Sequence, residues 1–551
     1  MSKRVLVGSE ASYLNTGYAS YGRELIKRLI ATGKYEVAEL SCYGAADDDR
    51  RKTIPWKNYP IAPSSSESDE VKRAYASNPA NQFGAWRFER ACLDFKPDCL
   101  IMQKDPWMDS WVKQSPFRPF FSWLWASTVD SAPQSPEWIS QFSDADYFYT
   151  LSEWAEGVIK EQAGDSVNLI GSVTMCAADE FKPVPNKAAH RLSMGLDPDW
   201  KIIGTVMRNQ RRKLFPDLFE AFAMYLSFTG DTKTYLYCHT SYPDNGWDLP
   251  QLMMKYGISS RVLFSYACDQ CGKLSISKFS DTVKQCKHCR TYSSKLSSVS
   301  NGATTEELAK IYNLFDIYIQ HSNSEGMGIG QLEAAACGVP IMSTDYSAME
   351  SIVRKLSGYP IPVKVKVLEL ETGCYRAIPD IDEIVSHWKM FFGLSSEDRI
   401  KAGQAARSAY EANFNWDDVL NKWMLSLDAS PKAKWDKPMR KITIPAEADI
   451  PKFNNNKAFL DWAISKFLPY SNLANSFEAN CLLRDLNFQS FKPNPCGFFY
   501  SEHSYFDRTH FTPFTKEHVL NMFKAKAEVF NFWESARVGG TGLRNEDWLN
   551  D

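Results

Sequence analysis

Long apolar runs are absent from this sequence of 551 residues. No stretch approaches the roughly 18 to 20 apolar residues that a membrane-spanning helix needs. The opening segment, MSKRVLVGSE, has an apolar run that Gly8 and Glu10 interrupt, and this run is too short for the core of a signal peptide. An excess of one charge is also missing, because the formal net charge is −3. We therefore expect a soluble protein with no membrane span and no general attraction to nucleic acid or anionic lipid.

A disulfide framework is equally unsupported. The chain has 13 cysteines, an odd number, and nine of them lie singly within apolar stretches. Small secreted domains instead carry paired cysteines in dense, regular spacing. A reducing compartment fits best, so we expect the cytoplasm, or the host cytoplasm if the chain is viral.

The other four cysteines form a separate motif. CDQC at 268–271 and CKHC at 286–289 are two Cys-x2-Cys pairs with 14 residues between them. This spacing is typical of a zinc ribbon, in which four thiolates complete a tetrahedron and leave no open position. We predict one structural Zn²⁺ bound by Cys268, Cys271, Cys286 and Cys289, and His288 is not needed as a ligand.

The ribbon segment is basic although the whole chain is not. Between Cys268 and Lys295 there are six basic and two acidic side chains, a local charge of +4. Such a patch favours contact with nucleic acid. The alternative is a small folding staple with a solvated basic surface, and the sequence leaves both open.

The order of apolar segments predicts an α/β fold. Strands are expected at 4–8, 99–102, 120–126 and 147–151, with helices at 21–29 and 153–162. Pro183, Pro185 and Pro198 mark 181–199 as a linker without regular structure. A second alternation of strands and helices then runs from 201 to 320. Two doubly wound halves with a cleft between them are therefore expected.

The sharpest local signal is SEGMGIGQLEAAACGVPIMSTD, residues 324–345. Glu325 lies in a glycine-rich loop after a strand, and Gly328 and Ile329 precede a good helix-forming stretch. The N-terminus of such a helix offers free N–H groups and a positive dipole end, which suit a phosphate. Glu333 lies more than one turn into the helix, so both carboxylates can face one cleft and bind hydroxyl groups.

Two further loops follow predicted strands. GTVMRNQRRKLF, residues 204–215, places Arg208 and Lys213 where doubly wound folds bind their ligands. Arg211 and Arg212 in the same loop are interpreted as solvated. LNTGYASYG, residues 14–22, puts Gly17 between the first strand and the first helix.

Together these motifs resemble the large retaining glycosyltransferase family that includes glycogen and sucrose synthases. Glu325 and Glu333 match its Glu-x7-Glu spacing, and Arg208 and Lys213 match its Arg-x4-Lys spacing. The resemblance implies the GT-B fold, with two Rossmann-like domains facing a cleft. The segments expected are an N-terminal acceptor domain at 1–180, a nucleotide-sugar domain at 199–410 with the zinc-ribbon insertion at 266–300, a closing helix at 411–430 and a C-terminal extension of unknown role at 445–551.

The resemblance also implies roles for individual residues. Arg208 and Lys213 would neutralise the diphosphate of a nucleotide-sugar co-substrate, expected to be a UDP-sugar. Glu325 would bind the sugar hydroxyls and Glu333 the ribose. Catalysis would retain the anomeric configuration and need neither a protein nucleophile nor a catalytic metal. The remaining donor-binding positions implied are Gly17, Gly328, Ile329 and, near the nucleotide base, Ser265 and Tyr266.

One departure from the family concerns the N-terminal domain. Many members hold a histidine against the sugar 6-hydroxyl, whereas WASTVDSAP here contains Asp130 and no histidine. Either Asp130 replaces that histidine as a polar contact or base, or the donor is a pentose that lacks the hydroxymethyl group.

The acceptor is the least determined part of the prediction. The basic ribbon beside the cleft favours DNA with a hydroxylated base, as in viral DNA modification. The alternatives are a transferase that acts on a glycan, a lipid-linked precursor or a protein, and an inactive transferase scaffold that binds nucleic acid. The sugar, the donor base and the oligomeric state stay open.

Overall fold

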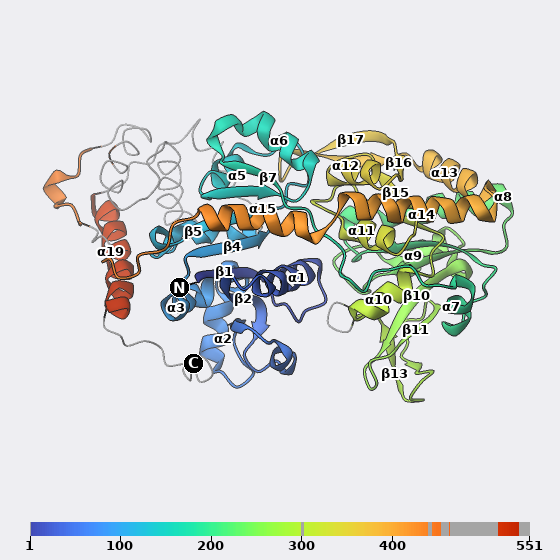
Figure 1. Ribbon diagram of the computed structural model, residues 1–551, viewed down its shortest axis with the longest axis horizontal. Helices are drawn as coiled ribbons and strands as arrows, with labels where there is room; N and C mark the ends of the chain where they lie inside the picture. Colours follow the sequence, from blue (N-terminus) through green and yellow to red (C-terminus); the bar gives the residue numbers. More distant parts are fainter. Residues whose placement is uncertain (1, 299–301, 439–442, 453–461, 463–515, 539–551) are drawn as a thin grey trace.

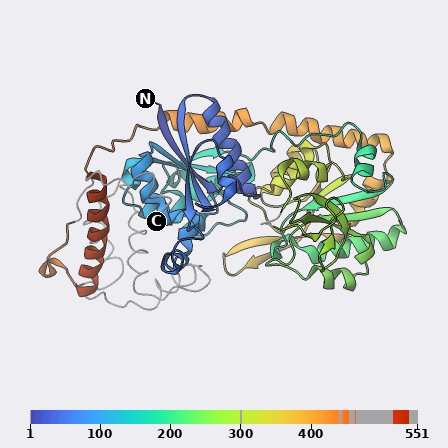
Figure 2. The ribbon, with the colours of Figure 1, turned by 90° about the horizontal axis from the view of Figure 1, so that it is seen from below.

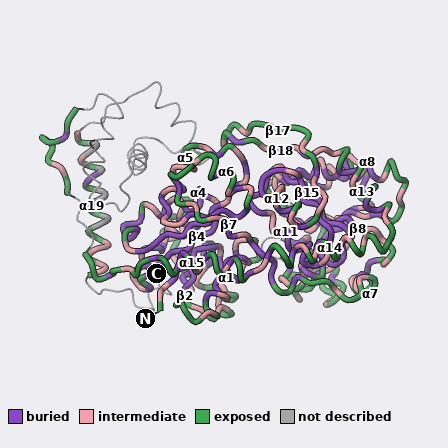
Figure 3. Tube along the Cα trace, turned by 45° about the horizontal axis from the view of Figure 1, so that its top comes forward, coloured by how far each residue is buried: buried purple, intermediate pink, exposed green. Residues whose placement is uncertain are grey.

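The computed structural model describes residues 2–298, 302–438, 443–452, 462 and 516–538. Two α/β halves lie side by side, each built on its own sheet (Figure 1). Buried strands occupy the middle of each half, whereas exposed residues gather on the outer helices and loops (Figure 3). Within the described residues, no helix is both long and apolar enough to cross a membrane.

The first half contains β1 (Lys3–Glu10), α1 (Gly17–Ala31), β2 (Tyr35–Ala45), β3 (Lys57–Ala62), α2 (Asp69–Ala76), α3 (Phe88–Phe95), β4 (Cys99–Lys104), α4 (Pro106–Asp109), β5 (Ser122–Ser127), α5 (Pro136–Phe142), β6 (Tyr147–Thr150), α6 (Glu153–Ala163) and β7 (Leu169–Ser172). Its seven strands are parallel, in the order β3-β2-β1-β4-β5-β6-β7. Every residue of β4 and β5 is buried, as expected for parallel strands that are covered on both faces.

The second half contains α7 (Lys187–Ser193), β8 (Lys201–Val206), α8 (Phe215–Thr229), β9 (Thr234–His239), α9 (Leu249–Lys255), β10 (Val262–Cys268), β11 (Leu274–Lys278), β12 (Lys284–Gln285), β13 (Tyr292–Leu296), α10 (Thr305–Tyr312), β14 (Ile317–Gln320), α11 (Ile329–Ala336), β15 (Ile341–Thr344), α12 (Ala348–Lys355), β16 (Tyr359–Ile361), β17 (Val363–Glu369), β18 (Cys374–Pro379) and α13 (Ile381–Gly393). Strands β10, β9, β8, β14, β15 and β16 form the parallel part of its sheet. Helix α10 begins with a capping box of Thr304 and Glu307.

The cysteine-rich segment continues this sheet and is not a separate module. Strand β10 extends to Cys268 and pairs antiparallel with β11 and β13. Strand β12 then pairs with β13. The same strand thus serves both the parallel sheet and the ribbon.

Two other elements differ from the sequence prediction. The expected linker at 181–199 contains α7, which begins directly after Asn186, whose side chain accepts a hydrogen bond from the Ala189 amide. Three prolines suggested irregular structure, but two of them precede the helix and the third follows it. The β17–β18 hairpin, a two-stranded antiparallel sheet, was not predicted at all.

The chain returns to the first half through two long helices, α14 (Ser396–Asn413) and α15 (Trp416–Ala429). They run along one side of both halves (Figure 2). On α15, the Trp423 indole donates to the Tyr21 hydroxyl at 2.9 Å and packs on Tyr149 with 4.7 Å between ring centroids. Further on, Trp533 of α19 (Lys516–Val538) packs against Phe117. Trp423 is thus fully buried and Trp533 partly buried against the first half.

Candidate active site

The loops at the carboxyl ends of the two sheets meet between the halves. A pocket of about 180 Å³ lies there, and its lining includes Gly17 and Arg23 from α1 and Ile329, Gly330 and Glu333 from α11. A methyl group added at Gly17 would lie 3.7 Å from the Ile329 side chain. The Gly17 loop of the first half and the start of α11 in the second half are therefore close enough to contact the same ligand.

Glu325 is the centre of the polar network in the second half. Its carboxylate contacts Lys213 and accepts hydrogen bonds from Arg212 at 2.7 Å and from Ser322 at 2.6 Å. Burial favours the neutral form, but the charges of Arg212 and Lys213 outweigh it and hold the pKa of Glu325 well below its usual range. Glu325 is therefore an anion with its charge fixed between two cations.

Lys213 is buried beside this carboxylate. Burial and the Arg212 charge lower the pKa of Lys213 to about 8, although Glu325 opposes them. Arg212, expected to be solvated, instead belongs to this cluster. Residues 211–213 form a short 3-10 helix, in which Lys213 and Arg212 both reach Glu325, and the sequence pattern carries no mark of that turn.

Arg208 lies apart from Lys213. It forms a two-bond ion pair with Asp244, at 2.9 and 3.1 Å, and its side chain is half exposed. The prediction treated Arg208 and Lys213 as one pair, but in the structure each has its own carboxylate partner. A polyanion between them would compete with both carboxylates.

Glu333 faces the pocket from α11. Its carboxylate accepts a hydrogen bond from the Tyr312 hydroxyl at 2.7 Å. Burial raises the pKa of Glu333 to about 7, with the Tyr312 hydrogen bond as a smaller opposing effect. Gly328 precedes the first helical residue at φ +72, a left-handed conformation that suits glycine. Ile329 and Gly330, the first two residues of the helix, line the pocket.

Asp130 reaches the second half across the cleft. Arg376 of β18 donates to its carboxylate at 2.8 Å and to the Ser324 hydroxyl at 2.6 Å. The same hairpin bonds to the first half through its main chain, since the Tyr375 amide donates to the Ala132 carbonyl at 3.0 Å. Arg376 was missed by the sequence analysis because the hairpin that carries it has no motif. Ser324, the residue before Glu325, also donates to Asp130 at 3.3 Å, so Asp130 lies beside the Glu325 loop.

Ser265 and Tyr266 lie on β10 and point to opposite sides of the sheet. The Ser265 hydroxyl is engaged with Tyr237 and His239, both at 2.8 Å. The Tyr266 ring is fully buried, and its hydroxyl accepts from the Ser280 amide at 2.7 Å. The main chain of both residues is also used within the sheet, because β11 pairs with Ser265 and Tyr266 and the Ser265 carbonyl accepts from the Ser297 amide at 3.1 Å.

The first half contributes further polar groups that the sequence analysis missed. Asp105 follows β4 and accepts from the Tyr18 hydroxyl at 2.7 Å, which also bonds to Thr128 at 2.7 Å. Glu10 ends β1, and burial raises the pKa of both Glu10 and Asp105. A methyl group at Gly326 would lie 1.9 Å from Thr128. The two halves are therefore tightly apposed at this point.

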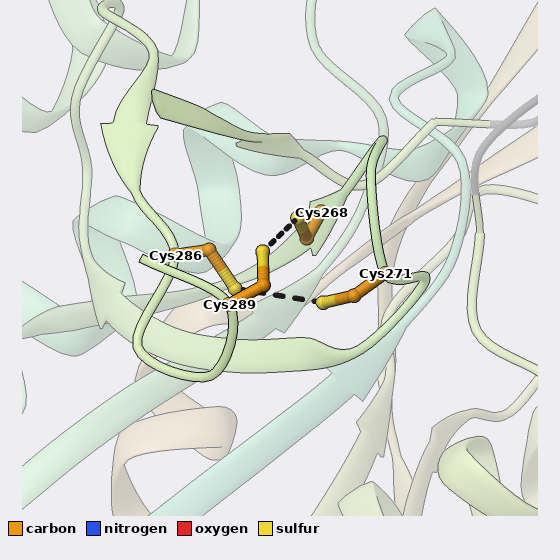
Figure 4. A group of neighbouring side chains, drawn as sticks. All are labelled: Cys268, Cys271, Cys286 and Cys289. Carbon is orange, nitrogen blue, oxygen red and sulfur yellow. Dashed lines mark hydrogen bonds between the residues drawn. The ribbon is translucent and has the colours of Figure 1, made fainter. Parts of the chain in front are cut away.

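The four predicted metal ligands come together at the end of β10 (Figure 4). Their sulfur atoms all lie within 4.8 Å of one another. Cys268 and Cys289 are 3.6 Å apart, and Cys271 and Cys286 are 3.7 Å apart. Zinc–sulfur bonds of about 2.3 Å in a tetrahedron require sulfur separations of about 3.8 Å. The donor set fits Zn²⁺, and His288 contacts the Leu274 carbonyl instead.

The basic side chains of the ribbon divide into two groups. Lys284 lies over the Tyr266 ring and donates to Ser277, and Lys295 pairs with Asp269 at 2.6 Å. Lys273, Lys278, Lys287 and Arg290 are exposed and form the second group. These four cations are the ones available to a partner.

Comparison with known proteins gives a partial sequence match. Residues 295–372 match the family model for glycosyl transferases group 1. Over 136 residues the chain is 26% identical to D-inositol 3-phosphate glycosyltransferase of Segniliparus rotundus, which covers 25% of this chain and 27% of the relative. The chain thus spans about a quarter of the length of that curated relative. Both matches support a glycosyltransferase enzyme.

Solved structures match most of the chain. Sucrose-phosphate synthase from Thermosynechococcus elongatus aligns with a TM-score of 0.56 and 16% identity, covering 78% of this chain and 100% of that one. Anabaena HepE in complex with UDP aligns with a TM-score of 0.51 and 12% identity, covering 78% and 100%. The fold is GT-B. In this GT-B chain, the resemblance drawn from Glu325, Glu333, Arg208 and Lys213 correctly indicated the architecture.

Proposed function

We propose that this chain is a retaining glycosyltransferase that moves a sugar from a UDP-sugar to a hydroxyl acceptor. The observation that carries the proposal is the cluster of Lys213, Arg212 and Glu325 beside Gly328 at the start of α11, the helix whose first residues line the pocket between the halves. Cations and a helix N-terminus there suit a diphosphate leaving group. HepE, which shares the fold, was solved with UDP.

The donor roles follow from this arrangement. Arg208 and Lys213, together with Arg212, neutralise the diphosphate as it departs, and the backbone of Gly328 and Ile329 lies against it. Glu325 binds sugar hydroxyls. The remaining donor contacts proposed are Glu333 with the ribose, Gly17 on the facing side, and Ser265 and Tyr266 near the base.

Retention is proposed to proceed by front-face attack. A donor phosphate oxygen takes the acceptor proton, the acceptor oxygen bonds to the anomeric carbon, and the bond to the leaving diphosphate breaks. The chain itself then supplies charge and position. Asp130 is proposed to contact the sugar, supported by its bonds to Arg376 and its place next to the Glu325 loop. A pentose donor is the second reading of that position.

We propose that Cys268, Cys271, Cys286 and Cys289 hold one structural Zn²⁺, supported by their sulfur spacing. The ion would cross-link the loop at 268–271 to the loop at 286–289. Zinc content measured by atomic emission should be one per chain. A protein prepared without zinc that keeps the ribbon protected from proteolysis would contradict the proposal.

We propose DNA with a hydroxylated base as the acceptor. Support comes from Lys287 and Arg290, which are exposed on the ribbon. The ribbon follows the carboxyl end of β10, and β8 and β14 end at the same edge of the sheet, in the cleft. The free cysteines of the described residues fit a reducing cytoplasm. The division of the chain at 1–180, 199–410 and 411–430 is supported by its two sheets and by α15.

The deciding experiment measures nucleotide release from uridine, guanosine and adenosine diphosphate sugars, both hexoses and pentoses. Each donor is offered with hydroxymethylated DNA, plain DNA or no acceptor. The DNA is then digested to nucleosides, whose masses are measured by mass spectrometry. A sugar mass on the modified base alone supports the proposal. Release that ignores DNA refutes the DNA acceptor and favours a glycan, lipid-linked or protein acceptor. No release from any donor favours an inactive scaffold.

A further inference from the structure

Two exposed aromatic rings lie at the carboxyl edge of the first sheet. Tyr43, near the end of β2, is 38% exposed, and Trp107, on α4 directly after β4, is 48% exposed. Each packs edge-on against buried Phe83, with centroid separations of 5.6 and 4.9 Å and interplanar angles of 88° and 89°. We call Tyr43, Phe83 and Trp107 the aromatic platform. Phe83 is 2% exposed, whereas both outer rings leave part of their surface to solvent.

The platform is fixed from below by an unusual buried cation. Lys104 is fully buried, pairs with Asp109 at 3.0 Å and donates to the Phe83 carbonyl at 3.3 Å. The Cys42 thiol donates to the same carbonyl at 3.1 Å. Burying such a pair costs desolvation energy, so it is poor evidence for stability alone. Its position under Phe83 instead gives the platform a rigid base.

Backbone strain is found at the same place. Tyr43 has φ +62, a conformation that non-glycine residues seldom adopt and that tends to occur at functional sites. A bulky aromatic residue in this conformation is costly, and asparagine or glycine would suit the turn better. The strain therefore supports a role for the ring itself.

The platform adjoins the polar groups of the cleft. Strands β2, β1 and β4 are neighbours in the sheet, so Tyr43, Glu10 and Asp105 stand at adjacent strand ends. Burial, followed by the Glu10 charge and more weakly the Asp105 charge, raises the pKa of Tyr43. The Thr16 hydroxyl donates to Glu10, and Thr16 lines the pocket between the halves. Glu10 therefore lies between the pocket and the strand end that carries Tyr43.

We propose that the aromatic platform is the acceptor subsite, where Tyr43 and Trp107 stack the pyrimidine ring of a hydroxylated base turned out of a DNA strand. This inference rests on the proposed function and deepens it. Aromatic faces bind bases of any sequence by stacking, and an enzyme that modifies a base must bring it out of the stack. Glu10 and Asp105 then lie where polar groups on the ring edge can donate to them.

The test compares Trp107→Ala, Trp107→Phe and Tyr43→Leu with Phe228→Ala, which removes a 66% exposed ring of α8 in the second half. The substrate is a single-stranded oligonucleotide with one 5-hydroxymethylcytosine. Loss of one stacking partner should raise its KM about 10-fold. Trp107→Phe should restore most of the wild-type KM, and Phe228→Ala should retain it.

Binding of the same oligonucleotide, followed by fluorescence anisotropy without donor, separates this inference from the proposed function. If the wild-type protein releases no nucleotide from any donor, the proposed function fails, yet a 10-fold weaker Kd in Trp107→Ala would still support the platform. Unchanged KM and Kd in both Trp107→Ala and Tyr43→Leu would overturn it. A higher KM for maltose as acceptor, together with an unchanged KM for the oligonucleotide, would overturn it as well.

Discussion

On the second half of the cleft, cations and carboxylates are paired with each other: Lys213 and Arg212 with Glu325, and Arg208 with Asp244. The facing edge of the first half has Glu10 and Asp105 bonded to neutral hydroxyls, beside exposed aromatic rings. The cations of these ion pairs are held in place for an anionic ligand such as a diphosphate, which would compete with the paired carboxylates. Neutral partners and ring faces suit a ligand recognised by shape and hydrogen bonds, so the two edges are equipped for different substrates.

The largest effect is expected from the paired edge. Lys213→Ala removes a buried cation and leaves Glu325 with Arg212 alone. Turnover should fall about 10²- to 10³-fold, as for loss of one charge-stabilising donor in other enzymes. The measurement is nucleotide release at saturating donor. Arg211→Ala, which removes a cation from the same short helix, serves as the control, and an equal loss in both variants would contradict a specific role for Lys213.

Glu333 gives a pH-dependent prediction. Its pKa is raised from 4.5 to about 7, so the folded state binds the proton more tightly than the unfolded state. This contribution to stability is fully present below pH 4.5 and is lost as the pH rises through about 7.

Glu333→Gln should remove that dependence. Urea unfolding of both proteins from pH 4.5 to 8 should show the wild type losing stability relative to Glu333→Gln by on the order of 3 kcal/mol. Tyr312→Phe, which removes the hydrogen-bond partner, should leave the dependence in place. Parallel pH curves for wild type and Glu333→Gln would show that burial does not shift this carboxyl.

The ion pair of Asp130 with Arg376, which joins the two halves, is expected to have a smaller effect on turnover. Asp130→Ala should lower kcat/KM about 10-fold if its carboxylate meets the sugar, and Arg376→Ala should do nearly the same by releasing Asp130. The double variant should then add little beyond either change, since the residues act as a unit. Full turnover in Asp130→Ala would remove this residue from the mechanism for both hexose and pentose donors.

The smallest effect is expected on the ribbon. Lys287→Ala with Arg290→Ala should lower the slope of log affinity against log salt by about two for hydroxymethylated DNA, because each cation neutralises one phosphate. Lys295→Ala, whose cation already pairs with Asp269, is the matched control. An unchanged slope in the double variant would assign the ribbon a structural role alone.

The sequence by itself determined the residues whose chemistry depends on local spacing. Glu325 and Glu333 share one loop and helix, and each cysteine pair lies within one tight turn, so a few residues of separation set their geometry. The alternation of strands and helices likewise predicted both parallel sheets. These features rest on contacts that are near in sequence.

Only the tertiary structure decided which distant groups meet, both within each half and across the cleft. Arg212 with Glu325, Arg376 with Asp130, and Trp107 with Phe83 join residues that lie 113, 246 and 24 positions apart or on different elements. No periodicity records such pairs, because they depend on how the two sheets and the β17–β18 hairpin pack. The ribbon shows the same limit: its ligands were evident from spacing, but its continuity with β10 came from strand pairing, which the spacing does not encode.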